Sequence, residues 1–124
     1  MSSDLQLLRK YYEGWKEGSF DPELFSEDLT FHGPLSRAEN LDEFMAILKQ
    51  MSEMVEVEGL EFKGLFVDGY GNGCAVYDFI TSKPKRMRTE CAELFHIEEG
   101  KIKEIRLIYD AREWEKILEP AKKK

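Results

Sequence analysis

The stretch that decides the fold is residues 74–98, which read CAVYDFITSKPKRMRTECAELFHIE. Both halves alternate apolar and polar side chains, the pattern of half-buried strands, and the charged segment between them is typical of a turn. Pairing the two strands symmetrically about Pro84 places Ala75 opposite Glu93 and Tyr77 opposite Cys91. The stretch therefore predicts a long antiparallel hairpin, with strands over about 74–82 and 86–98, in a defined register.

Two further strands extend the pattern on either side of this hairpin. Apolar residues recur over 57–68 and 101–109, and the reversals are marked by three glycines at 69–73 and by Glu99-Gly100. Four strands joined in series by short turns predict an antiparallel meander. In this register Cys74 and Cys91 point to opposite faces of the sheet, which argues against a disulfide between them.

Capping boxes predict three helices, because Ser, Asn or Asp is followed three positions later by Gln or Glu. These boxes begin at Ser3, Asn40 and Asp110, and we expect the first helix to end at Gly18 and the last at Pro120. A proline after an N-cap aspartate predicts a short helical turn at 21–25, followed by a strand at 29–32.

Helices followed by a meander predict an α+β domain. We expect one domain over residues 1–120, with N-terminal helices packed in the hollow of a curved, mainly antiparallel sheet that leaves a pocket. The basic tail at 121–124 is expected to be disordered.

Composition limits the partners. A formal net charge of −7 argues against nucleic acid, and the basic residues around Pro84 are interpreted as a charged hairpin tip, with a phosphate or carboxylate docking spot as the alternative. The first residues lack a signal peptide and no apolar run is long enough to span a membrane, so a cytoplasmic protein is expected. Neither cysteine has a histidine at ligand spacing, so we expect reduced thiols and no metal.

Glu93 is the main candidate for chemistry. It shares one face of its strand with Cys91, Phe95 and Ile97, all of which favour burial. A buried carboxylate must find hydrogen-bond donors or take up a proton, because burying it ionised and unpaired costs several kcal/mol. Such residues are candidates for functional sites.

Other polar and aromatic side chains are expected around Glu93. Tyr11 and Trp15 lie four apart on the first helix, so a hydroxyl and an indole can reach the same region. We name Tyr11 and Glu93 as catalytic candidates, and as ligand-binding candidates Trp15, Phe31, Tyr77, Phe79, Phe95, Leu107 and Tyr109. The alternative for each aromatic residue is packing in the core.

Several segments, in their order and spacing, resemble a known family: YYEGW at 11–15, LTFHGP at 29–34, AELF at 92–95, GKI at 100–102 and IYDAR at 108–112. They are similar to the SnoaL-like and ketosteroid-isomerase-like branch of the nuclear-transport-factor-like superfamily, and the resemblance covers nearly the whole chain. It implies a cone-shaped, cystatin-like α+β barrel that admits small, mostly apolar molecules. Members of that superfamily include isomerases, cyclases, hydratases, plain binders and inactive partners, so the fold does not settle the function.

The resemblance also implies roles for single residues. Tyr11 falls near the helix tyrosine that ketosteroid isomerases use in their oxyanion hole, and Glu93 falls near the acid that accompanies it. Gly33 stands where those isomerases place an aspartate base before a proline. His32 alternates to the opposite face and is interpreted as a surface histidine.

Three hypotheses follow. In the first, the chain is a cofactor-independent enzyme in which Glu93 moves a proton on a small apolar substrate while Tyr11, Tyr77 or Tyr109 stabilises developing oxygen charge. In the second, the pocket binds a hydrophobic ligand without converting it. In the third, the outer sheet face forms a homodimer through Val76, Ile80, Leu94 and Ile108.

Overall fold

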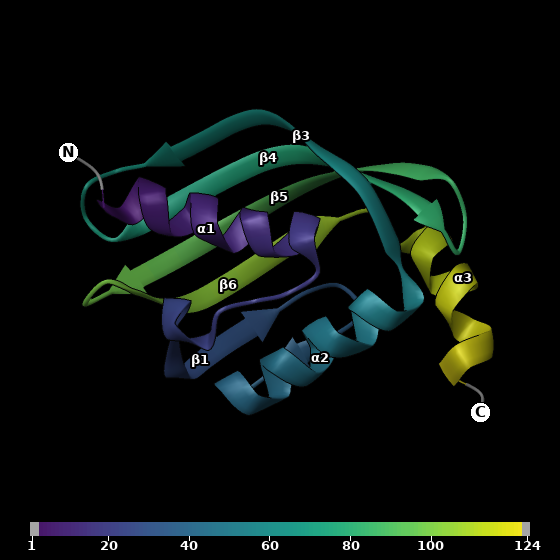
Figure 1. Ribbon diagram of the computed structural model, residues 1–124, viewed down its shortest axis with the longest axis horizontal. Coiled ribbons are helices and arrows are strands. Elements are labelled where there is room, and N and C mark those ends of the chain that lie inside the picture. Colours follow the sequence, from purple (N-terminus) through teal and green to yellow (C-terminus); the bar gives the residue numbers. More distant parts are fainter. Residues whose placement is uncertain (1–2, 123–124) are drawn as a thin grey trace.

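The computed structural model describes residues 3–122, and over that range the chain forms three α-helices, one short 3₁₀ turn and a six-stranded sheet (Figure 1). The strand order is β2-β1-β6-β5-β4-β3. All neighbouring strands are antiparallel except β1 and β6, which pair in parallel. The expected α+β fold, with helices against a curved, mainly antiparallel sheet, is confirmed.

The meander consists of β3 (Glu56–Val67), β4 (Asn72–Lys83), β5 (Met87–Glu98) and β6 (Lys101–Tyr109). The β4–β5 register is the expected one, with Ala75 opposite Glu93 and Tyr77 opposite Cys91. Cys91 is buried on the concave face, whereas Cys74 pairs with Leu94 on the outer face, and both thiols are free. The β5–β6 reversal places Glu99 and Gly100 at φ values of 53° and 77°, as a tight hairpin turn requires.

Helix α1 (Ser3–Glu17) lies across the concave side of the sheet (Figure 1). The buried side of this helix is formed by Leu7, Leu8, Tyr11 and Tyr12. These residues make an apolar stripe wide enough to contact the sheet on one flank and the rest of the core on the other. The helix ends where expected, because Gly18 adopts a φ of 76°.

The chain then forms a 3₁₀ turn, η1 (Pro22–Leu24), whose N-cap Asp21 accepts a hydrogen bond from the Glu23 backbone N–H at 2.9 Å. Strand β1 (Phe25–His32) follows directly and is longer than the expected strand at 29–32. Its pairing with β6 has a register shift between Phe25 and Thr30. The residues in between are largely polar, so the first half of the strand lacks the alternation that predicts a strand. The two-residue β2 (Arg37–Ala38), which the sequence pattern did not indicate, pairs with the end of β1.

Helix α2 (Leu41–Met54) begins as the capping signal predicts, with the Asn40 side chain accepting from the Glu43 backbone N–H at 2.9 Å. Phe44 and Leu48 are buried against β1, and the Phe44 ring packs on Phe25 with ring centroids 5.4 Å apart. The helix thereby forms a second wall beside the concave face of the sheet (Figure 1).

Helix α3 (Arg112–Lys122) lies at the end of the sheet farthest from the N-terminus (Figure 1). Asp110 accepts from the Arg112 backbone N–H at 3.1 Å, but Glu113 pairs with Lys85 at 2.5 Å instead of closing the expected capping box. The helix also continues through Pro120, so the predicted stop is wrong. A proline removes one hydrogen bond and crowds the carbonyl four residues earlier, but only two residues of the helix follow Pro120, so few further turns depend on that position.

The helix reaches residue 122, and residues 123–124 lie outside the described residues, so the disorder expected for 121–124 stays a prediction. Within the described range, no helix is long and apolar enough to cross a membrane.

Candidate functional site

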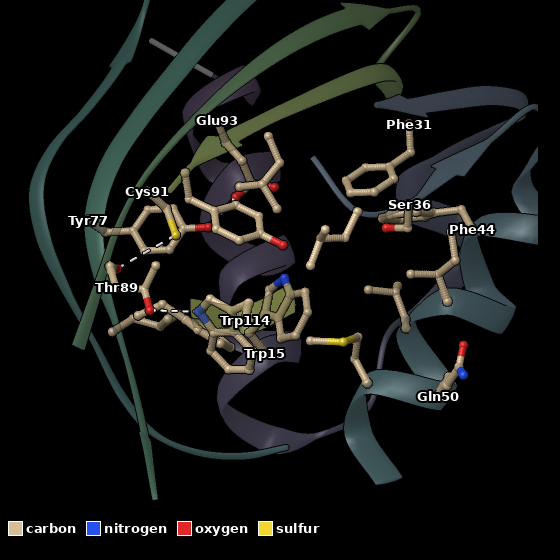
Figure 2. Close-up of a pocket in the computed structure, with 18 of the residues that line it drawn as sticks. Trp15, Phe31, Ser36, Phe44, Gln50, Tyr77, Thr89, Cys91, Glu93 and Trp114 are labelled. Carbon is tan, nitrogen blue, oxygen red and sulfur yellow. Dashed lines mark hydrogen bonds between the residues drawn. The ribbon is translucent and has the colours of Figure 1, made fainter. Parts of the chain in front are cut away.

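A cavity of about 190 Å³ lies between the concave face of the sheet and the three helices (Figure 2). Its walls are mainly aromatic and aliphatic, and among the described residues no Lys, Arg or His lines it. Trp15, Phe79 and Met51, which could have filled the hollow, line the cavity and leave it open. Among the described residues, the lining consists of Tyr11, Trp15, Phe31, Leu35, Ser36, Phe44, Ile47, Leu48, Gln50, Met51, Met54, Leu60, Tyr77, Phe79, Thr89, Cys91, Glu93, Leu107, Tyr109 and Trp114.

Glu93 on β5 reaches this cavity and is only 1% exposed. Three hydroxyl groups donate hydrogen bonds to its carboxylate: Tyr12 to Oε1 at 2.5 Å, Tyr77 to Oε1 at 2.7 Å and Tyr11 to Oε2 at 3.0 Å. We call these three side chains the tyrosine cluster. Two members come from α1 and one from β4, so the packing of the helix on the sheet assembles the site.

The carboxylate keeps one place for a further donor. An ionised carboxylate offers about four acceptor positions, two on each oxygen. Oε1 accepts two hydroxyl groups, whereas Oε2 accepts only that of Tyr11. The described hydrogen bonds therefore leave an acceptor position on Oε2, and Glu93 is one of the residues that line the cavity.

Burial and hydrogen bonding act on Glu93 in opposite directions. Burial raises the pKa of its carboxyl above 4.5, while the hydrogen bonds from Tyr12, Tyr77 and Tyr11 lower it, and burial is the stronger effect. Burial, with the nearby Glu93 charge second, raises the pKa of each member of the tyrosine cluster. The phenols therefore remain protonated donors, and Glu93 is the carboxylic acid of this cluster, with its pKa raised.

Helix α3 contributes one wall of the cavity through Trp114. Trp114 is 3% exposed, lines the cavity, and donates its indole N–H to Oγ1 of Thr89 at 2.9 Å (Figure 2). Cys91 lies between Thr89 and Glu93 on the same strand face, and burial raises the pKa of its thiol to about 12. This cysteine is a protonated wall residue and a poor nucleophile at neutral pH.

Most of the side chains expected at the pocket are found there. Tyr11 and Glu93 are hydrogen-bonded to each other, and both line the cavity together with Trp15, Phe31, Tyr77, Phe79, Leu107 and Tyr109. Phe95 is the exception, because it lies outside the lining and packs in the core against the rings of Tyr11 and Tyr12, with centroids 5.6 and 6.1 Å away. Sharing a strand face with Glu93 places Phe95 under α1, and the helix covers it.

Tyr12 is the member of the site that sequence analysis missed. Its hydroxyl makes the shortest hydrogen bond to Glu93, at 2.5 Å. The adjacent pairs Leu7-Leu8 and Tyr11-Tyr12, one turn apart, were the available signal, because they indicate a helix buried on two flanks. Thr89 and Trp114, which also line the cavity, carried no comparable signal.

Gly33, which the sequence resemblance aligns with the aspartate base of ketosteroid isomerases, lies close to the Phe31 ring. A Cβ added at Gly33 would lie 3.1 Å from the Phe31 ring, so the ring would have to shift by a few tenths of an ångström to admit a side chain there. His32 follows Phe31 on β1 and is partly exposed. His96 is not among the residues that line the cavity, and its Nε2 lies 2.8 Å from Oε2 of Glu98. Among residues 3–122, no three His, Cys, Asp or Glu side chains gather as a metal site requires.

Comparisons with known proteins identify a matching family model and solved structures with the same fold. A family model described as a SnoaL-like domain matches residues 8–105. No curated protein matches significantly. Among solved structures, a protein from Kribbella flavida DSM 17836 is 21% identical with a TM-score of 0.80, covering 100% of both chains.

Two further structures share the fold. A protein from Cytophaga hutchinsonii ATCC 33406, described as NTF2-like and of unknown function, is 19% identical with a TM-score of 0.73, covering 92% of this chain and 95% of that one. An LEH-like epoxide hydrolase from M. tuberculosis is 15% identical with a TM-score of 0.75, covering 88% of this chain and 84% of that one. At these sequence identities the similarity establishes the fold, and any reaction has to be argued from the residues of the cavity.

Proposed function

Because the chain belongs to the SnoaL-like family, whose fold is shared by cyclases, isomerases and epoxide hydrolases, we propose that its cavity binds a small, mostly apolar molecule on which Glu93 acts as a general acid and base. The reaction class is isomerisation, cyclisation or hydration without a cofactor. The observation that carries this proposal is the buried Glu93 carboxylate, held by three phenols at the wall of an otherwise apolar cavity.

In this proposal the polar groups have different tasks. Glu93 moves the proton at Oε2, because a raised pKa brings a carboxyl closer to the working pH of a general acid or base. Tyr11 and Tyr77 already donate to Glu93, so their first task is to fix the carboxylate and to offset its burial. Tyr109 also lines the cavity and supplies a further hydroxyl for oxygen charge that develops on the substrate.

The walls define the substrate by size and polarity. A cavity of about 190 Å³ suits a compact molecule of one or two rings, and the aromatic and methionine side chains favour apolar surface. Glu93 and Thr89 on β5 could orient such a molecule from one side and Ser36 and Gln50 from the other, so the substrate needs at least one polar atom.

The chain offers an internal reporter for binding. Its two tryptophans, Trp15 and Trp114, both line the cavity, so occupancy changes their fluorescence directly. We expect a screen of phenols, hydrophobic alcohols and ketones, and terpenoid-like compounds to give hits that change this fluorescence and raise Tm. At about 100 times Kd a ligand adds about 2.7 kcal/mol of stability.

Product analysis of the hits distinguishes the enzyme hypothesis from the hypothesis of a binding module. A new product that forms with the native protein supports the enzyme. Stabilisation without any product supports the alternative of a binding module, which the loss of the family's usual base at Gly33 favours. A complete absence of hits across these classes would contradict both.

A second proposal concerns the outer face of the sheet, which we propose forms a homodimer. Phe66, Leu94 and Ile108 are 61%, 43% and 52% exposed, and all three lie on strands of the meander. Beside them Asp78 is held by Lys63 and Arg88 at 3.4 and 2.7 Å. An apolar area bordered by ordered charges is typical of interaction surfaces.

We expect light scattering to report a dimer at micromolar concentration, and a Leu94→Glu variant to be monomeric. Tyr70→Glu is the matched control, because Tyr70 is 88% exposed at the β3–β4 turn and does not belong to the sheet face. A monomeric native protein would contradict this proposal without affecting the cavity.

A further inference from the structure

The Glu93 carboxylate has donors beside it but no positive charge from the part of the chain that the structure describes. All three of its hydrogen bonds come from neutral phenols, and no cationic side chain lines the cavity among the described residues. Buried ionised carboxylates are ordinarily paired with a cation, because neutral donors offset only part of the cost of leaving water. A bound cation would supply the missing charge.

The surrounding walls favour a cation with an apolar body. Trp15 packs edge-on against Phe79 with ring centroids 5.6 Å apart, and Phe79 lies 6.3 Å from Trp114. Figure 2 shows the two indoles toward one end of the cavity and Glu93 toward the other. These rings therefore offer apolar contact surface for the hydrocarbon part of a molecule whose charged end lies at Glu93.

We propose that the cavity selects a small apolar amine, whose protonated nitrogen donates to Oε2 of Glu93 while its hydrocarbon part lies against Trp15, Phe79 and Trp114. This inference deepens the proposed function and rests on it, since it names the chemical class of the molecule that the cavity holds.

Other ligand classes match the site less well. A neutral alcohol could fill the open position on Oε2 but would leave the carboxylate charge unpaired, and charge-assisted hydrogen bonds are about twice as strong as neutral ones. A carboxylic acid ligand would place a second negative charge in a cavity whose described lining holds no cation. The net charge of −7 adds an attraction for cations at a distance.

The neighbours of Glu93 do not compete with the amine. The titratable groups that face it are Tyr11, Tyr12, Tyr77 and Cys91, and burial raises the pKa of each, so all four are neutral at pH 7. Amine affinity should therefore follow the Glu93 carboxylate alone and weaken as the pH falls through its raised pKa.

The test compares two probes of the same shape. N,N-dimethylbenzylamine is protonated at neutral pH, and isobutylbenzene is its uncharged hydrocarbon counterpart. We expect tryptophan fluorescence titrations of the native protein to show that the amine binds at least about tenfold more tightly, a difference of about 1.4 kcal/mol. In Glu93→Gln this preference should disappear while isobutylbenzene still binds.

Glu90→Gln is the matched control, because it makes the same chemical change on the same strand but on the outer face, where Glu90 pairs with Lys63. It should leave the preference intact. If isobutylbenzene binds the native protein as tightly as the amine does, the inference is overturned and the proposed function stands. If neither probe binds, the cavity does not accept molecules of this size, and both proposals fail.

Discussion

Exchanging Glu93 for glutamine is expected to lower turnover about 10²- to 10⁴-fold, the usual contribution of a general acid or base. The amide has nearly the shape of the carboxylate but cannot take or give a proton at neutral pH. The experiment measures kcat and KM for whichever compound the product analysis identifies. A fall in kcat with little change in KM would place the effect on the chemical step.

The fold should survive this exchange. Glutamine keeps an oxygen that can accept from Tyr12 and Tyr77, and its NH₂ group can donate to the hydroxyl oxygen of Tyr11 after that hydroxyl turns. The variant should therefore retain the native circular dichroism and a cooperative unfolding transition. Glu90→Gln on the outer face is again the control and should keep full activity. Full activity in Glu93→Gln would end the enzyme proposal.

The second large effect is expected from the tyrosine cluster. Tyr12→Phe removes the shortest of the three hydrogen bonds to Glu93, and a bond to a charged group contributes about 1.5 to 3 kcal/mol. We expect the free energy of unfolding to fall by about 2 kcal/mol near pH 8, measured by urea denaturation. Tyr109→Phe is the control, because Tyr109 lines the same cavity outside the cluster.

The cost of Tyr12→Phe should depend on pH in a defined direction. The pKa of Glu93 is raised above 4.5, so the folded chain binds this proton more tightly than the unfolded chain, and stability falls as the pH rises from about 4.5 through the folded pKa. Removing a donor to the charged form raises that pKa further. The cost should therefore be larger near pH 8 than near pH 5. An equal cost at both would mean that Glu93 does not ionise in this range.

Much of the fold could be predicted from local patterns. The β4–β5 register followed from alternation on both sides of Pro84, and it placed Glu93 and Tyr77 on one face, as the structure does. The N-caps at Asp21 and Asn40 were predictable because a side-chain acceptor there satisfies a free backbone N–H.

What escaped prediction depends on contacts between distant segments. The first half of β1 carries polar residues at 26–28, so its alternation fails, and only pairing with β6 makes it a strand. Phe95 and Glu93 have the same local pattern, yet α1 covers one and leaves the other at the cavity. The helix that ran through Pro120 shows that a proline near a helix end is a weaker stop than its ring suggests.

The parallel pairing of β1 with β6 has a consequence for how the molecule forms. Phe31 on β1 stands beside Ile105 on β6, so the chain must close a long loop before these two strands can meet. Topologies dominated by such distant pairings fold slowly. On the ribosome, the apolar faces of α1, β1 and α2 emerge before β6 has been synthesised. The nascent chain therefore exposes these surfaces to aggregation or to chaperones, and the cavity comes into existence only when the last strand arrives.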